Sequence, residues 1–200
     1  MRAVLEPANL CAIRCWLMAR LPWPSDIDAD PAQLRQHLFH EAEGIEALPS
    51  QTLIEEAERE AQRDPHRSER LLTWSWRNEV IRLSDFGTWH TVGDALPREA
   101  CRRSAVEAAA FLRKFPDGLP GPQGPDRQAR YLTHVSKIRK LAKSSDLLRS
   151  VPLLSILAAE RDQRGREECE ALRFSCEDGS HRAIAMALAG HETISAWIAY

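Results

Sequence analysis

The clearest pattern of hydrophobic and polar positions lies near the end of the chain. From 172 to 176, apolar side chains alternate with polar ones, which predicts a half-buried strand. The alternation stops at 177–179, where Gly179 can take a positive φ and form a tight turn. Ser180 is then the expected N-cap of a helix. The pattern therefore predicts a strand that leads through a short turn into a helix.

The same pattern continues to the last residue. Apolar residues at helical spacing carry the predicted helix from Ser180 to Leu188, and Gly190 is the expected C-terminal stop. Strand character returns at 193–198. Residues 171–200 thus form a strand, turn, helix and strand in sequence.

The start of this predicted helix presents groups suited to an anion. The backbone N–H groups of the first turn stand beside Ser180, His181 and Arg182, and a helix N-terminus favours negative charge. Arg182 could add a bidentate contact. The other interpretation is a capped amphipathic helix on which His181 and Arg182 are merely solvated. From the residues alone the two interpretations stand equal.

A family resemblance bears on this choice. The turn 178–182, the alanine-rich helix, Gly190 and the strand 192–197 resemble the ParB/sulfiredoxin superfamily, with 151–157 similar to its preceding strand. The resemblance covers roughly residues 126–200. In that superfamily a Gly-x-x-Arg turn binds nucleotide phosphates. The resemblance implies the same role for Gly179, Ser180, His181 and Arg182.

Departures from the superfamily pattern narrow what the resemblance implies. Ser180 stands where sulfiredoxins need a cysteine, so thiol repair is not expected, and the DNA-reading region of centromere-binding members does not follow. The chain resembles short, stand-alone members that act in plasmid fertility inhibition with ATPase and DNase activity. This implies ATP, Mg²⁺ and DNA backbone contacts. Glu177 or Asp178 would bind Mg²⁺ (Asp178 first) or orient water, and His181 and Arg182 would complete the catalytic set.

Composition sets broad limits. The 200 residues carry a formal net charge of −2, so no global field for nucleic acid or membrane is expected and DNA affinity must come from local patches. The five cysteines lack paired spacing, which argues against a disulfide framework or a zinc ribbon and favours reduced, cytoplasmic thiols. Segment 8–21 is too short and too charged to span a bilayer, and it predicts a buried or partner-packing helix.

The first 70 residues predict a helical extension with an acidic segment. A helix is expected over 52–63, opened by a capping box between Thr52 and Glu55. Residues 41–64 hold eight acidic residues against two arginines, a net charge of −6. This surface is either simply solvated or docks a basic partner, such as a component of a conjugation or type IV secretion system.

The middle of the chain predicts short strands and a helix. Strands are expected at 79–83 and 88–92 around a turn at 84–87, with most tryptophans in the core. A helix is expected over 97–114, and its buried candidates are Ala100, Val106, Ala110 and Leu112.

A segment rich in proline and glycine follows, and after it a basic segment. Residues 116–126 contain four prolines and three glycines, and predict either a domain linker or an ordered loop over the site, in both cases mobile relative to its flanks. Residues 126–149 then carry seven basic side chains against two acidic ones. An apolar stripe through Tyr131 and Ile138 predicts a helix, and Lys137 and Lys140 beside it are candidates for nucleotide or DNA-backbone contacts. The charged segment 159–170 predicts a hairpin between antiparallel strands.

Together these patterns predict an α+β protein: a helical extension at 1–70 and a ParB/sulfiredoxin-like domain at 71–200 with a small mixed sheet. The leading hypothesis is a cytoplasmic nucleotide-binding ATPase that acts on DNA. The alternative is a non-catalytic inhibitor that docks a DNA-transfer component through its acidic helices. A kinase built on the same turn is a third and weaker hypothesis.

Overall fold

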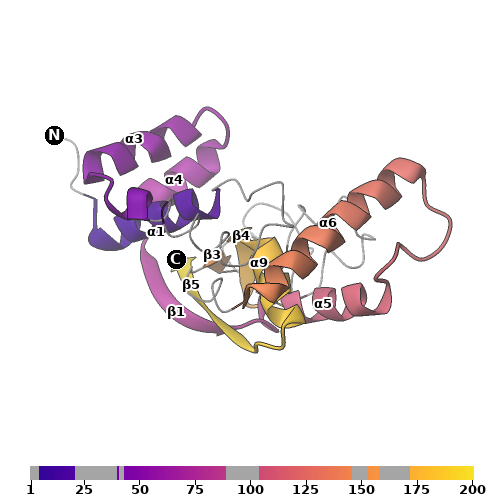
Figure 1. The fold of residues 1–200 in the computed structure, drawn as a ribbon. Helices are drawn as coiled ribbons and strands as arrows, with labels where there is room; N and C mark the ends of the chain where they lie inside the picture. The colour runs from indigo at the N-terminus through magenta and orange to yellow at the C-terminus, as the bar shows by residue number, and fades with distance from the viewer. Residues whose placement is uncertain (1–4, 21–39, 41–42, 89–103, 146–152, 158–171) are drawn as a thin grey trace. The chain divides into compact units, whose positions relative to one another are not determined.

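The computed structural model describes residues 5–20, 40, 43–88, 104–145, 153–157 and 172–200 (Figure 1). It combines helices with a small sheet, so the α+β prediction is confirmed. The chain divides into two compact units, residues 1–78 with 197–200 and residues 79–196. No helix in the described ranges is long and apolar enough to cross a membrane.

Three helices form most of the first unit: α1 (Pro7–Ala19), α3 (Ser50–Glu60) and α4 (Pro65–Thr73). They pack on one another and bury Trp16, Leu53 and Leu71. Helix α1 covers most of the segment predicted to be buried and confirms that prediction. Asn9 fixes its position by donating to the carbonyl oxygens of Leu71 at 2.9 Å and Trp74 at 3.0 Å.

The starts of α3 and α4 differ in how they are capped. The predicted capping box at Thr52 is wrong, because α3 begins two residues earlier, after Pro49, and has no side-chain cap. Helix α4 follows Asp64, whose Oδ1 accepts from the Arg67 backbone N–H at 3.0 Å. Burial alone would raise the pKa of Asp64, but the Arg67 N–H and the charges of Arg67 and Arg70 outweigh it and lower that pKa.

One acidic side chain of α3 serves the core of this unit. Glu60 is only 4% exposed, and its two oxygens pair with Arg20 at 2.8 Å and Arg67 at 3.1 Å. The Arg20 guanidinium also lies over the Trp16 ring, 4.8 Å from its centroid. The acidic segment is therefore partly structural, because a buried carboxylate needs such partners.

The described strands form one sheet in the order β1-β5-β3-β4-β2. Strands β3 and β4 pair antiparallel, whereas β2 and β4 pair parallel, so the predicted mixed sheet is confirmed. The strands are β1 (Trp76–Arg82), β2 (Phe86–Gly87), β3 (Leu153–Leu157), β4 (Phe174–Asp178) and β5 (Thr193–Ala199).

Three sequence predictions for this region need correction or lie outside the described residues. The predicted turn at 84–87 is only half right, since Phe86 and Gly87 form strand β2 against β4. Gly87 suits this position because a Cβ there would lie 3.2 Å from the Phe174 carbonyl oxygen. The predicted strand beyond residue 88 and the predicted hairpin at 159–170 lie outside the described residues.

Helix α9 (Ser180–Leu188) packs between α5 (Ala105–Lys114) and α6 (Pro125–Lys143) in the second unit (Figure 1). Its residues from Arg182 to Ala187 are all buried. At its other end Gly190 has φ 92°, and the His191 N–H donates to the Met186 carbonyl oxygen at 3.0 Å. The predicted glycine stop is therefore confirmed.

Helix α5 is shorter than predicted in its described part. Ser104 caps it through a capping box with Glu107. The prediction that Val106 and Ala110 are buried is wrong, because the helix instead buries Ala105, Ala108, Ala109 and Leu112, one stripe at helical spacing. The burial of Leu112 is confirmed, and Ala100 lies outside the described residues.

The proline- and glycine-rich loop after α5 is held by α6. Both of its flanks belong to the second unit, so it does not link the two units. The Leu119 N–H donates to Gln128 Oε1 at 3.0 Å, and Tyr131 donates its hydroxyl to the Phe115 carbonyl oxygen at 2.6 Å. Burial raises the pKa of Tyr131 to about 12, so it stays a neutral donor here. The apolar stripe predicted for α6 is confirmed by the burial of Tyr131 and Ile138.

Candidate functional site

The predicted strand–turn–helix is present. Strand β4 ends at Asp178, Gly179 takes φ 102°, and α9 begins at Ser180. Phe174 and Cys176 are buried and Arg173 is exposed, as the alternating pattern predicted. The left-handed conformation at Gly179 is one that other residues rarely adopt, and it turns the chain from the strand into the helix.

The prediction that Ser180 is the N-cap is wrong. Gly179 occupies the N-cap position, and Ser180 is the first helical residue. The Ser180 hydroxyl is buried and donates to Cys176 Sγ at 3.1 Å. Because this hydroxyl faces the strand, it ties the first turn of α9 to β4 instead of capping the helix.

His181, the second residue of α9, contacts a histidine of α6. Its Nε2 lies 2.8 Å from His134 Nδ1, and the two ring planes differ by 17° with centroids 5.0 Å apart. Nearly parallel rings with such close nitrogens and such distant centroids meet edge to edge. One nitrogen must therefore donate and the other accept, so the two histidines share a single N–H···N hydrogen bond.

The surroundings of this histidine pair disfavour further positive charge. Burial lowers the pKa of His181 to about 3, and the charges of Lys137 and His134 add to that effect. His181 is consequently a neutral imidazole at neutral pH. Lys137 lies one turn after His134 on α6, so a lysine and two imidazoles gather at the first turn of α9.

The remaining residues predicted for the site at the turn are Arg182, Glu177 and Asp178. Arg182 is 5% exposed, so the interpretation of a merely solvated Arg182 is wrong. The backbones of Glu177 and Asp178 lie at the end of β4, directly before the turn, while their side chains lie outside the described structure. Their assignment to catalysis and metal binding stays a prediction.

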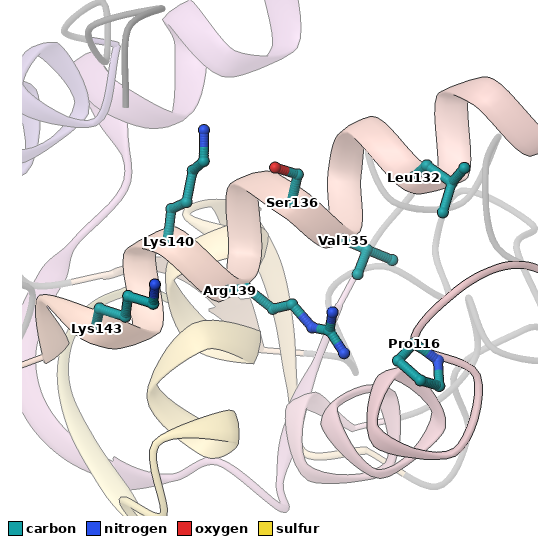
Figure 2. A pocket seen from close by; sticks show the side chains of 7 residues that line it. All are labelled: Pro116, Leu132, Val135, Ser136, Arg139, Lys140 and Lys143. Carbon is teal, nitrogen blue, oxygen red and sulfur yellow. The ribbon is translucent and has the colours of Figure 1, made fainter. Parts of the chain in front are cut away.

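The structure places Lys137 and Lys140 in different surroundings. Lys137 accompanies the histidine pair, whereas Lys140 lines a pocket of about 460 Å³ beside α6 (Figure 2). The pocket is lined by Pro116, Leu132, Val135, Ser136, Arg139, Lys140 and Lys143.

Sequence reasoning missed His134. Its pairing with His181 depends on how α6 packs against α9, which no local pattern reveals. A signal was nevertheless available: His134 lies next to the apolar stripe of α6 and three residues before Lys137, on the same side of the helix.

The described part of the chain therefore contains a strand–glycine–helix turn, a hydrogen-bonded histidine pair with one lysine, and a separate basic pocket. Comparison with known proteins adds nothing to this geometry: no protein-family model, no curated protein and no solved structure matches the chain.

Proposed function

We propose that this protein binds a nucleotide at the Gly179 turn and hydrolyses it, and that it acts on DNA as an ATPase with DNase activity. The observation that carries the proposal is the histidine pair beside Lys137 at the first turn of α9. The ParB/sulfiredoxin-like motif at 178–182 supports it. A cytoplasmic role in plasmid fertility inhibition, by blocking DNA transfer, is the biological setting that the resemblance implies.

Electrostatics favours an anion at this place. The backbone N–H groups of a helix start carry partial positive charge, and Lys137 adds a full one. The same positive surroundings help to keep His181 neutral. A bound phosphate would offset these positive charges and raise the pKa of His181, so that the neutral imidazole becomes a better proton acceptor when substrate is present.

The histidine pair provides a route for the proton that the attacking water releases during hydrolysis. If water attacks the terminal phosphorus, the P–O bond to the leaving nucleotide breaks and the water loses a proton. His181 can accept it at Nδ1 while its Nε2 passes a proton to His134 Nδ1. In this role His181 is the catalytic base and His134 is a positioning residue that sets its tautomer.

Phosphoryl transfer also needs a divalent cation. Carboxylate oxygens are the ligands that Mg²⁺ prefers, and it is usually held by one or two of them together with substrate phosphates. Glu177 and Asp178 provide this donor chemistry at the end of β4, so they would hold the ion, which would neutralise charge on the phosphates. Ser180 and Arg182 would act from within the fold by holding the turn in shape.

The test is ATP hydrolysis with Mg²⁺, with and without plasmid DNA, by the full chain and two histidine variants. We expect His181→Gln to lower turnover by about 100-fold, the usual contribution of a general base. His191→Gln is the matched control, because His191 lies after the opposite end of α9. Plasmid nicking would be read from the same samples. Equal turnover by all three proteins would overturn the proposal.

A second candidate function rests on α3. Glu55 and Glu58 on this helix are exposed, as a surface that docks a basic partner would require. In this alternative the protein is a non-catalytic inhibitor that binds a conjugation or secretion component. Reversing both charges (Glu55→Lys with Glu58→Lys) would then abolish inhibition of DNA transfer, while His181→Gln would leave it intact. The opposite pair of results would favour the hydrolase.

A further inference from the structure

The pocket beside α6 differs in chemistry from the Gly179 turn. One part of its lining is apolar, made by Pro116, Leu132 and Val135. Figure 2 shows Arg139 extending toward Pro116, whereas Lys140 extends in another direction. With Lys143, the lining combines an apolar surface with three cations.

None of these three cations forms an ion pair with a described acidic side chain. Helix α6 carries six basic residues and one acidic residue, Asp126, which lies in its first turn far from the pocket. The basic side of α6 is therefore available for an anionic ligand.

The length of the pocket lining suggests an extended ligand. From Leu132 to Lys143 the helix advances eleven residues, which is roughly 16 Å at the usual helical rise. A single phosphate would occupy only a fraction of this length. A polymer that repeats a negative charge beside an apolar unit fits both the length and the mixed lining.

We infer that the α6 pocket binds a single strand of nucleic acid, with phosphates at Arg139 and Lys143 and sugar or base against Leu132. A duplex turns its phosphates outward and stacks its bases inside, so it offers cations a partner but leaves Leu132 without one. Leu132 is 39% exposed, so its side chain is accessible to a sugar or base. The inference adds to the proposed function a place on the protein where DNA binds. It rests on the proposed function only in taking the polymer to be nucleic acid.

The α6 pocket and the histidine pair lie on different sides of helix α6. Adjacent residues are about 100° apart around a helix axis, so Arg139 lies roughly 140° from His134 on α6. Substitutions in the pocket can therefore be made without touching the residues that the proposed hydrolysis uses. For that reason the two proposals can fail independently.

The experiment measures binding of a labelled single-stranded oligonucleotide of about 12 nucleotides to the full chain over a range of salt concentrations. The pocket variant is Arg139→Gln with Lys143→Gln. Its matched control is Arg127→Gln with Arg130→Gln, which removes the same charge from the same helix outside the pocket. A third variant, Leu132→Ser, tests the apolar contact alone.

We expect the pocket variant to bind roughly tenfold more weakly, with a salt dependence (log K against log salt) shallower by about 1.4 for two lost phosphate contacts. The control should keep both the affinity and the slope. Leu132→Ser should weaken oligonucleotide binding and leave binding of polyphosphate, which has no sugar or base, unchanged. ATP turnover without DNA should be the same in all variants.

Several results would overturn the inference. No binding by the unaltered protein even at low salt would do so, as would equal losses in the pocket and control variants. Displacement of the oligonucleotide by polyglutamate at equal charge concentration would assign the pocket to an acidic peptide instead. Duplex DNA that binds as tightly as the single strand, with no effect of Leu132→Ser, would overturn the strand assignment. Loss of turnover in His181→Gln with unchanged oligonucleotide binding would leave both proposals standing.

Discussion

At the scale of single residues, the state of His181 depends on its neighbours. Burial is the main reason for its low pKa, and the Lys137 charge comes next. Replacing Lys137 with glutamine removes that charge, so the pKa of His181 should rise from about 3 toward its usual value while burial still holds it below 6.5. NMR titration of the imidazole C–H signals measures this. The proposed anion site depends on the same charge.

Lys140→Gln is the control for this measurement, because it removes an equal charge from the same helix but Lys140 does not contribute to the His181 shift. A rise of the same size in both variants would mean that the net charge of α6, rather than the Lys137 position, governs His181.

A second residue-scale prediction concerns Glu60. This buried carboxylate holds two arginines that are themselves partly exposed, so Glu60→Ala should lower the free energy of unfolding by about 3 kcal/mol, because it removes two charge-assisted hydrogen bonds worth roughly 1.5 kcal/mol each. Denaturant unfolding followed by circular dichroism gives the value. Glu56→Ala removes a carboxylate that pairs with Arg59 on the surface of the same helix, and should cost less than about 1 kcal/mol. Similar costs for the two variants would contradict a structural role for Glu60.

At the scale of elements, the glycine positions and the alternation of apolar and polar residues correctly predicted where helices and strands lie. The strand before Gly179, the helix after it and the stop at Gly190 were all predictable, because each depends on neighbouring residues in the sequence. The apolar stripe of α6 was predictable for the same reason. Such patterns report local conformation and one buried face.

The failures at this scale depend on which partner a side chain finds. Ser180 looked like a cap, yet its hydroxyl bonds to Cys176 on the preceding strand. Val106 looked buried, but α5 turns its alanines inward, and alanines give little signal of their own. His134 was missed because only the packing of α6 on α9 brings it to His181. Tertiary structure decides which side chains come into contact. The sequence alone therefore predicts the strand–turn–helix of the site but not the histidine pair.

Gly190 provides an element-scale prediction. Its φ of 92° is unfavourable for other residues, but a Cβ at this position would meet no atom within 4 Å. Gly190→Ala should therefore cost about 1 kcal/mol of unfolding free energy, from backbone strain alone. Gly44→Ala is the control: Gly44 is helical, has no positive φ and has the same open space, so this substitution should be neutral or stabilising. Equal costs at both glycines would rule out backbone strain as the cause.

At the scale of the whole molecule, the two compact units should respond differently to acid. In unit 79–196, folding lowers the pKa of His181 from 6.5 to about 3, so the folded state resists a proton that the unfolded state accepts. The stability from neutral His181 is complete above pH 6.5. It falls by up to about 1.4 kcal/mol for each pH unit below that, down to the folded pKa. In the unit of 1–78 with 197–200, Asp64 has a pKa lowered from 3.8, so its contribution is lost only below that pH.

Acidification from pH 7 to pH 5 should consequently loosen unit 79–196 first, while the helices of the other unit stay protected. Hydrogen exchange with mass spectrometry, corrected for the intrinsic effect of pH on exchange, resolves the two sets of peptides. His181→Gln cannot take up the proton, so it should remove most of the pH dependence from α9 and α6 and leave α3 and α4 unchanged. Simultaneous loosening of both units in the unaltered protein, or earlier loosening of α3 and α4, would show that groups other than His181 control the acid response.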